Sequence, residues 1–274
     1  MSLNSTAATQ NSVWQWRESS GLPYLQCELL QDWQHGFFTQ QCYPRLPQDL
    51  VTTLDPQAQV YRVKQVHGNT VLTPQQISSN SQEENTSFPD ADGIITEANQ
   101  QSVWVASADC NPVLIADRST GQVAAVHAGW RGTAQKIVPN AIARFQAHGS
   151  QLQDLLIAIG PAISGSVYQV GENVAAEVGK SILLDQDSEQ FKDNKTVLNA
   201  LLEIEDSPVL EDQHPQRVKL DVRRVNQIQL QQLGIEQEQI AIAPYCTYQQ
   251  PNYFFSYRRT KQKKVQWSGI VSKT

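Results

Sequence analysis

Apolar residues gather in two short runs near the middle of the chain. Residues 103–117 read VWVASADCNPVLIAD, and residues 122–133 read QVAAVHAGWRGT. Runs of Val, Ile and Ala of this length, bounded by Gly, Pro, Asn and Asp, predict buried β-strands. Cys110 follows the first run and His127 ends the second, each in a tight turn. Because strand ends present side chains to a crevice from a rigid scaffold, this stretch predicts a functional site.

The hydrophobic pattern elsewhere predicts further strands. Apolar and polar residues alternate over 14–29, which predicts an antiparallel hairpin. Short apolar runs predict strands at His35–Thr39, Val60–Val66, Val71–Leu72, Asp92–Thr96, Leu155–Gly160 and Ile240–Ala243. The two runs on either side of His67 indicate a strand–turn–strand unit that carries this histidine in its turn.

Amphipathic segments with recognisable ends predict the helices. They are expected over 133–148, 172–184, 197–202 and 221–233. Thr133 is the predicted cap of the first helix, Gly149 is its stop, and Pro139 is expected to kink it. Asp221 is the predicted cap of the last helix, which Gly234 ends.

Two segments lack such a pattern. Residues 1–12 are polar and are expected to be flexible, and residues 74–90 predict a mobile surface loop inserted in the fold. Strands and helices interleave over 13–274, and no composition shift marks a linker. The sequence therefore predicts one α/β domain of mixed α+β type, with mixed sheets flanked by helices.

Composition restricts the class of protein. A formal net charge of −6 argues against non-specific binding to nucleic acid or to anionic lipid. No apolar run approaches the roughly 20 residues of a membrane helix, and the N-terminal residues do not resemble a signal peptide. The four cysteines show no C-x-x-C spacing. We therefore expect a cytoplasmic protein with free thiols and no membrane partner.

Three residues at predicted strand ends suggest metal chemistry. His67, Cys110 and His127 are zinc ligands by type, and three protein ligands leave a fourth position for water or substrate. Their long spacing leaves open that they are structural residues of the core or of turns. It also leaves open a thiol hydrolase in which Cys110 is the nucleophile, His127 the base, and Asp109 or Asp92 the orienting group.

Two further segments could bind a ligand. In Gly129–Thr133 a strand leads through a turn into a helix, and Arg131 offers a bidentate donor to phosphate or carboxylate. The same arginine could equally form a salt bridge in a tight turn. Among residues 253–259, the aromatic side chains are expected mostly in the core and Arg258 and Arg259 mostly in solvent, although aromatics beside arginine also suit stacking on a purine.

Taken together, these segments resemble the laccase-domain family, also called the YfiH-like or multicopper polyphenol oxidase family. The matching stretches are Gln65-Val66-His67-Gly68, Ala91-Asp92-Gly93, Ala108-Asp109-Cys110-Asn111-Pro112-Val113, His127-Ala128-Gly129-Trp130-Arg131-Gly132, Ile159-Gly160-Pro161 with Tyr168 and Gly171, Leu220-Asp221, and Cys246-Thr247-Tyr248 with Phe255-Ser256-Tyr257-Arg258-Arg259. They run in the family's order from about residue 35 to 260 and so cover most of the chain.

The resemblance implies a fold, an activity and a cofactor. It implies a single α/β domain and a zinc site made by His67, Cys110 and His127, with copper as the alternative metal. It also implies phosphorolysis of adenosine, inosine and S-methyl-5′-thioadenosine, together with deamination of adenosine. The expected partners are thus purine nucleosides and phosphate, and we expect a monomer or a homodimer.

Site roles follow from the residues and the resemblance together. Catalytic roles are expected for Cys110, His127, Asp109 and Arg131. Substrate binding is expected for Arg131, Asp92, Tyr257 and Arg258.

The sequence departs from the family pattern at three places. Where relatives often carry Arg and a Gly-Gly turn, this chain has Gln40-Gln41-Cys42-Tyr43. If that Arg binds phosphate in relatives, Arg45 or Arg62 would have to replace it here. Ala162 stands at a common Cys position, and Trp267-Ser268-Gly269 stands in place of a C-terminal Gly-Arg.

Three other functions compete with the phosphorylase. Copper-dependent oxidation of phenols is the origin of the family name, but the chain lacks the dense His-x-His pairs of a multicopper cluster. A thiol hydrolase would use Cys110 and His127. A purine-sensing module would bind nucleoside without turnover.

Overall fold

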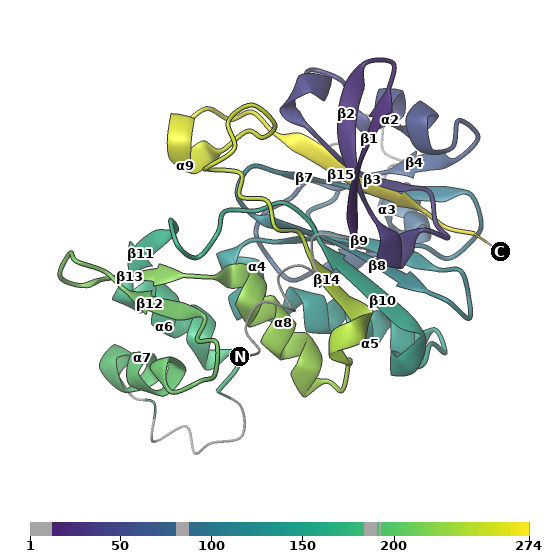
Figure 1. Ribbon diagram of the computed structural model, residues 1–274. Coiled ribbons are helices and arrows are strands. Elements are labelled where there is room, and N and C mark those ends of the chain that lie inside the picture. Colours follow the sequence, from purple (N-terminus) through teal and green to yellow (C-terminus); the bar gives the residue numbers. More distant parts are fainter. Residues whose placement is uncertain (1–12, 81–87, 184–190, 192, 274) are drawn as a thin grey trace, which may run out of the picture.

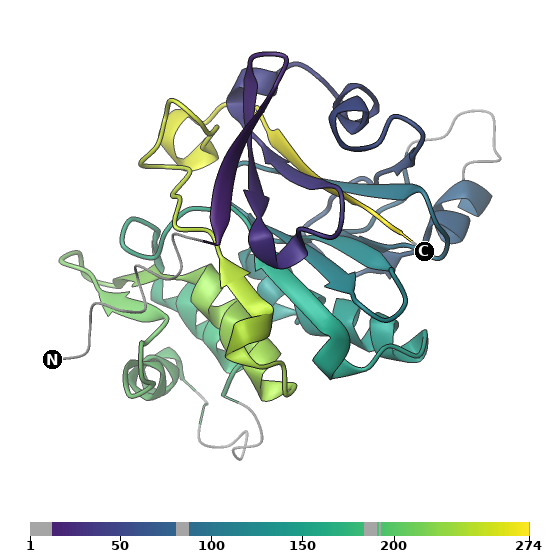
Figure 2. The ribbon, with the colours of Figure 1, turned by 45° about the vertical axis from the view of Figure 1, so that its right-hand side comes forward.

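Two six-stranded sheets form the centre of the protein. The computed structural model describes residues 13–80, 88–183, 191 and 193–273. The first sheet has the order β1 (Trp14–Ser19), β2 (Leu22–Cys27), β3 (His35–Phe38), β15 (Gln266–Val271), β7 (Gln101–Ser107) and β4 (Gln59–Tyr61). The second sheet has the order β14 (Ile240–Ile242), β10 (Leu155–Ile159), β8 (Asn111–Asp117), β9 (Val123–Ala128), β6 (Gly93–Ile95) and β5 (Val71–Leu72). Figures 1 and 2 show these sheets as two stacked layers.

A third, smaller sheet and the helices surround these layers. The small sheet has the order β11 (Gln169–Gly171), β13 (Arg217–Leu220) and β12 (Val209–Glu211). The helices are α2 (Pro47–Leu54), α3 (Pro74–Asn80), α4 (Trp130–Ala134), α5 (Ile137–Ala147), α6 (Glu172–Lys180), α7 (Asn194–Leu202), α8 (Val222–Gln232) and α9 (Tyr257–Thr260). Over the described residues, no helix has both the length and the apolar character that a membrane span requires.

Successive side chains of a strand point to opposite faces of its sheet, and this alternation divides the core into layers. In β7, Val103 and Val105 belong to the core between the two large sheets, whereas Trp104 belongs to the cluster under α2. The strands β8 and β9 alternate in the same way, and their second face packs on α5. Trp104 needs Gly269 beside it, because a Cβ there would lie 2.4 Å from the indole ring. The nearly continuous apolar runs of β8 and β9 are thus strands buried on both faces.

Both large sheets combine parallel and antiparallel pairs. The pairs β4–β7, β5–β6 and β10–β14 are parallel, and the other named pairs are antiparallel. This arrangement confirms the predicted mixed α/β class. The predicted hairpin over 14–29 is also confirmed, because β1 and β2 pair antiparallel from Trp14 opposite Cys27 to Ser19 opposite Leu22.

Three of the predicted helix ends are confirmed, at Asp221, Gly149 and Gly234. Asp221 is the N-cap of α8, and its carboxylate accepts hydrogen bonds from the backbone N–H groups of Arg223 and Arg224. Gly149 and Gly234 have left-handed φ values of +98° and +92° just after α5 and α8, which confirms them as helix stops.

The single helix predicted over 133–148 is wrong. The segment forms α4 and α5, separated at Lys136, which has a left-handed φ of +60°. Thr133 lies inside α4, whose N-cap is Gly129. Pro139 explains the break, because its ring clashes with the carbonyl four residues before it and it has no N–H. In the first turn of α5 that missing N–H costs nothing.

Some other predictions were also incomplete. The strand predicted at Val60–Val66 is only β4, and it lies in a different sheet from β5, so the two do not form one unit around His67. The loop predicted at 74–90 begins as α3, because Ile77 is buried in the core. The short strands β11, β12, β13 and β15 were not predicted. Residues 1–12 and 81–87 lie outside the described residues, as does Leu184 at the end of the helix predicted over 172–184.

Candidate metal centre

His67, Cys110 and His127 meet at one point of the structure. Their ligand atoms all lie within 4.8 Å of one another. The two imidazole rings are nearly perpendicular, with centroids 4.8 Å apart. His127 is buried, Cys110 is partly buried and His67 is exposed. Among the described residues, no other group of three such ligands forms a cluster.

Strand pairing brings Cys110 to His127. In the antiparallel pair β8–β9, Asn111 lies opposite Ala128 and Pro112 lies opposite His127. Cys110 therefore sits at the start of β8, directly across from the end of β9. A Cβ on Gly129 would lie 2.9 Å from Sγ of Cys110, so the close approach of the two chain segments requires glycine there.

Asp92 connects His127 with the turn that carries His67. Its Oδ1 accepts a hydrogen bond of 2.8 Å from Nδ1 of His127. The same carboxylate accepts backbone hydrogen bonds from Val66, His67 and Gly68 at 3.1, 3.0 and 2.7 Å. His67 has a left-handed φ of +61°, which a non-glycine residue rarely adopts without such support. Asp92 thus fixes both the ring of His127 and the turn that carries His67.

The charges at the site support one another. Burial raises the pKa of Asp92, but the hydrogen bonds from His127 and from the turn outweigh it, so its pKa is lowered. Burial also disfavours the Cys110 thiolate, yet His127 and His67 lower its pKa to about 6. The pKa of His127 is raised to about 9, because the Cys110 thiolate and Asp92 outweigh its burial. At neutral pH the metal-free site therefore holds a thiolate beside an imidazolium.

The three side chains fit a metal ion. A thiolate and two imidazoles are donors that zinc accepts, and a tetrahedral ion at its usual bond lengths holds its ligands roughly 3.5 Å apart. The ligand atoms are within 4.8 Å of one another, so only a small contraction is needed. Nδ1 of His127 is engaged by Asp92, which leaves Nε2 to face the ion.

A cleft of about 640 Å³ opens in front of the three ligands. Its lining includes all three ligands and a group of cationic side chains, Arg131, Arg258, Lys263 and Lys264. It also includes the aromatic side chains Trp130, Tyr168, Tyr257 and Trp267. Positive charge next to flat aromatic surfaces suits a ligand that has both an anionic group and a planar ring.

Arg131 and Arg258 offer cationic groups in different ways. Arg131 is exposed in the cleft with its guanidinium 4.2 Å from the Trp130 ring. Within the part of the chain that the structure describes, its guanidinium forms no hydrogen bond or ion pair, so the predicted salt bridge is absent there. Arg258 is held more firmly, since its guanidinium donates to the carbonyl of Gln169 at 2.6 Å and lies 4.8 Å from the Tyr168 ring.

Asp109 holds two chain segments together and is not the group that orients the His127 ring. It has a left-handed φ of +93°, and its carboxylate accepts hydrogen bonds of 2.7 Å from the Thr247 hydroxyl and from the backbone N–H of Arg258. Of the two carboxylates that the sequence offered as partners of His127, the structure brings Asp92 to that ring. Asp109 instead joins the turn before β8 to the segment that carries Arg258.

Three residues that the sequence analysis names, one of them a predicted substrate contact, lie outside the lining of the cleft among the described residues. Asp92 is fully buried beneath the centre and does not line the cleft, so direct contact with substrate does not match its position. Arg259, expected in solvent, donates to the carbonyls of Thr247, Tyr248 and Phe254. Gln40 donates to the carbonyl of Pro251 and lies outside the described lining of the cleft.

Neither arginine offered as a substitute for the family's Arg lines the cleft among the described residues. The guanidinium of Arg62 lies 4.1 Å from the Phe88 ring and 5.7 Å from the ring of Trp267. Arg45 is exposed at the start of the segment that leads into α2.

Sequence reasoning missed several residues of the site. Tyr168 lines the cleft, and burial, with the nearby Cys110, raises its pKa to about 12. Lys263 and Lys264 follow α9 in a polar run that carries no motif. Asn111 belongs to a stretch that matches the family but had no predicted role, and the structure buries it next to Cys110 in the chain. For Lys263 and Lys264, the signal available in the sequence is the basic run 261–264, KQKK.

The chain matches a known family and close relatives. The family model described as multi-copper polyphenol oxidoreductase laccase matches residues 45–272. A relative from Synechocystis, purine nucleoside phosphorylase slr1573, is 52% identical over 266 residues, which cover 96% of this chain and 98% of the relative. A protein of Mycobacterium bovis that is also named purine nucleoside phosphorylase is 32% identical and covers 74% of this chain and 68% of its own length.

Solved structures share the fold. YlmD from Geobacillus stearothermophilus superposes with a TM-score of 0.75 at 22% identity, covering 94% of this chain and 99% of its own. YfiH of Bacillus licheniformis gives a TM-score of 0.74 with the same identity and coverage. At this identity the likeness shows the architecture alone.

Proposed function

The chain belongs to the multi-copper polyphenol oxidoreductase laccase family, and we propose that it is a zinc-dependent purine nucleoside phosphorylase. Its substrates would be adenosine, inosine and S-methyl-5′-thioadenosine with phosphate, and it would also deaminate adenosine. The relative named purine nucleoside phosphorylase supports the first activity, since it matches this chain at 52% identity over nearly its whole length. The single observation that carries the proposal is the cleft, which joins a Cys/His₂ centre to cationic and aromatic walls.

Zinc is the metal that we propose for this site. His67, Cys110 and His127 would hold it, and when bound it would act as a Lewis acid on a substrate oxygen or nitrogen. A multicopper cluster needs many histidines, but the chain has only five. The three outside the centre have other partners: His35 bonds Cys27 and Trp33, His148 bonds Gln122, and His214 bonds Asp212. Copper-dependent oxidation of phenols is therefore disfavoured.

The cationic side chains would bind phosphate. Arg131 lies in the cleft with a guanidinium that has no ion pair among the described residues, and Lys263 and Lys264 line the same space. Bidentate contact between an arginine and a phosphate fixes orientation as well as charge. In this proposal, Arg131, Lys263 and Lys264 would take the role of the Arg that relatives often carry near position 40.

The aromatic side chains would bind the nucleoside. Trp130, Tyr168 and Tyr257 offer ring faces or edges to a purine, and Arg258 lies over the Tyr168 ring. In phosphorolysis a phosphate oxygen forms a bond to C1′ of the ribose, the bond from C1′ to N9 breaks with its electron pair, and the purine takes up a proton. The chain contributes by holding both reactants in one cleft, which lowers the entropic barrier of a two-substrate reaction.

Incubation of the purified protein with adenosine, with and without phosphate, tests the proposal. Adenine, inosine and ribose 1-phosphate are followed by chromatography. Phosphate-dependent release of adenine with ribose 1-phosphate is expected. No phosphate-dependent adenine would refute the phosphorylase, and inosine alone would leave only the deaminase.

A thiol hydrolase is the second candidate. Cys110, His127 and Asp92 have the contacts of a nucleophile, a base and an orienting carboxylate, with the pKa of Cys110 lowered to about 6. The two functions exclude each other, since a thiolate bound to zinc is not a free nucleophile. Rapid alkylation of Cys110 by iodoacetamide without a chelator would favour the hydrolase. Protection that a chelator removes would favour the zinc centre.

A further inference from the structure

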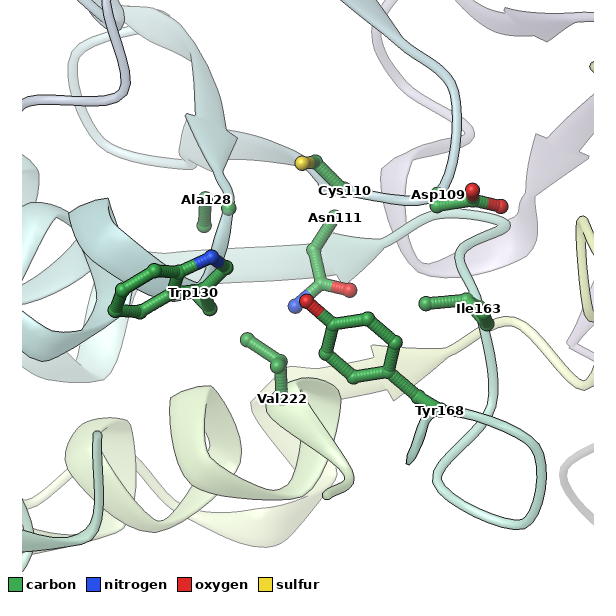
Figure 3. Close-up of a pocket in the computed structure, with 9 residues that line it drawn as sticks. Asp109, Cys110, Asn111, Ala128, Trp130, Ile163, Tyr168 and Val222 are labelled. Atoms are coloured by element: carbon green, nitrogen blue, oxygen red, sulfur yellow. The ribbon is translucent and has the colours of Figure 1, made fainter. Parts of the chain in front are cut away.

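A second, much smaller cavity lies against the cleft. Its volume is about 30 Å³, and it shares Asp109, Cys110, Trp130 and Tyr168 with the lining of the cleft. Figure 3 shows it between Trp130, Tyr168 and Val222, with Cys110 above Asn111 in this view.

Asn111 is the unusual residue of this cavity. It is only 2% exposed, yet its Nδ2 has no hydrogen-bond partner among the described residues. A buried amide N–H without a partner is costly, so native proteins nearly always satisfy it with protein or with ordered water. The position of Asn111 at the start of β8 is fixed by its pairing with Ala128, so its side chain cannot move far to find another partner.

Polar groups of two neighbours point into the same space. In Figure 3 the carboxamide of Asn111, the hydroxyl end of Tyr168 and the indole nitrogen of Trp130 are all turned toward the space that these residues line. The carboxylate of Asp109 is turned away and is occupied by Thr247 and Arg258. The cavity thus offers an unpaired donor and two further polar groups, and it has room for no more than a very small ligand.

We propose that this cavity is a dedicated site for one water molecule, which Asn111 positions next to the centre for the hydrolytic reaction. A buried water needs a volume of this order and two to four polar partners, and about 30 Å³ is too small for a nucleoside or a phosphate ion. This inference rests on the proposed function, because it explains how one centre handles water and phosphate. Phosphate would reach the centre through the large cleft, and the water would lie in the small cavity that adjoins the cleft along Cys110, Trp130 and Tyr168.

The hydrolytic reaction is the deamination of adenosine. The water oxygen forms a bond to C6 of the purine, and the bond from C6 to the exocyclic nitrogen breaks. One proton of the water passes to the amino group, which leaves as ammonia, and the other ends on N1 of the inosine formed. No oxidant or reductant is needed. Asn111 is a positioning residue in this step, since it contacts the water and not the nucleoside.

The variant Asn111→Leu tests the proposal on the full, metal-loaded protein. Leucine has the same branching as asparagine and no polar atom, so the cavity keeps its shape and loses the donor. We expect the ratio of inosine to adenine formed from adenosine with phosphate to fall at least tenfold. A crystal structure should show one water in the wild-type cavity and none in the variant. The conservative variant Asn111→Ser keeps a donor and is expected to retain both the water and a ratio within threefold of wild type.

Other outcomes would overturn the proposal. They are an empty cavity in the wild-type protein, a phosphate oxygen bound there, an unchanged product ratio in Asn111→Leu, or adenine without any inosine from the wild type. If the wild type forms neither product, the proposed function fails. The crystallographic test then still decides whether the cavity binds water.

Discussion

The carboxylate of Asp92 lies 2.8 Å from Nδ1 of His127 and also accepts the backbone N–H of His67 at 3.0 Å. One buried side chain therefore orients two of the three candidate ligands. Outer partners of this kind fix the tautomer and direction of a ligating histidine. The centre is thus held from beneath, where substrate does not reach.

Replacing Asp92 should weaken metal binding without removing a ligand. In Asp92→Asn, the amide has one acceptor oxygen for four donors, so His127 and the 66–68 turn lose their common anchor. We expect zinc affinity to fall about 10- to 100-fold, measured by competition with a chromophoric chelator. Asp90→Asn is the matched control, since that exposed carboxylate pairs with Lys64 away from the three ligands, and its replacement should leave affinity unchanged. Equal affinities in the two variants would contradict the role of Asp92.

Removing the thiolate should remove the metal. We expect Cys110→Ala to lose bound zinc in elemental analysis, because two imidazoles alone hold the ion weakly. Cys246→Ala provides the control, since this buried thiol accepts hydrogen bonds from Ser164 and lies outside the ligand cluster. Equal zinc in wild type and Cys110→Ala would rule out the centre.

Zinc binding should release protons in a pH-dependent way. With pKa values of about 6 for Cys110 and about 9 for His127, the free site holds one proton, on His127, between these values. The ion needs the thiolate and a neutral imidazole, so binding at pH 7.5 should release about one proton. Affinity should then rise about tenfold per pH unit from 6 to 9. Titration calorimetry in two buffers of different ionisation enthalpy measures this release, and a value near zero at pH 7.5 would refute the ion pair.

Arg131 should matter for phosphate and not for folding. Its guanidinium is exposed and free of ion pairs in the described structure, so Arg131→Ala is expected to leave the melting temperature unchanged. Loss of a charge-assisted contact should lower kcat/KM for phosphate roughly 10- to 100-fold. Arg45→Ala, outside the described lining of the cleft, should change it less than twofold. The reverse order would make Arg45 the phosphate ligand.

Acid should destabilise the fold through His35. Burial lowers the pKa of His35 to about 4, although the carbonyl of Trp33 opposes this, and Nε2 accepts the backbone N–H of Cys27 at 2.9 Å. Between pH 6.5 and 4 the unfolded chain binds a proton that the folded protein does not. Stability from this residue is therefore complete above pH 6.5 and falls by about 3 kcal/mol toward pH 4.

Urea unfolding at several pH values measures this loss. In His35→Gln, which keeps a donor and an acceptor, the fall between pH 6.5 and 4 should be smaller by about that amount. An identical pH dependence in both proteins would contradict the assignment.

The pattern of neighbouring residues in the sequence was enough to predict many of the helices and strands. The alternation over 14–29 predicted the β1–β2 hairpin, and the Asp221 cap with Gly234 predicted α8, because the atoms that decide these features are a few residues apart. The break at Lys136 also follows from a local rule, the disruption of a helix by proline. Pro139 carried enough information to divide that helix into two.

Short strands were missed for a different reason. The strands β11, β12 and β13 have three or four residues each and are specified by their partners rather than by their own pattern. The same holds for β15, which completes the first sheet between β3 and β7 from the far end of the chain. Pairing over such distances leaves little trace in a local window.

By itself the sequence determined the mixed α/β class, the family, and the residue types His67, Cys110 and His127 as candidate ligands. Only the tertiary structure decided how these residues work together. Asp92, predicted to contact substrate, is a buried anchor of the two histidines. Asp109 links the turn before β8 to the segment that carries Arg258. The amide nitrogen of Asn111 has no hydrogen-bond partner among the described residues. The reason is physical: strand type and turn type depend on neighbours in the chain, whereas hydrogen-bond partners, burial and pKa depend on groups that pairing of distant strands brings together.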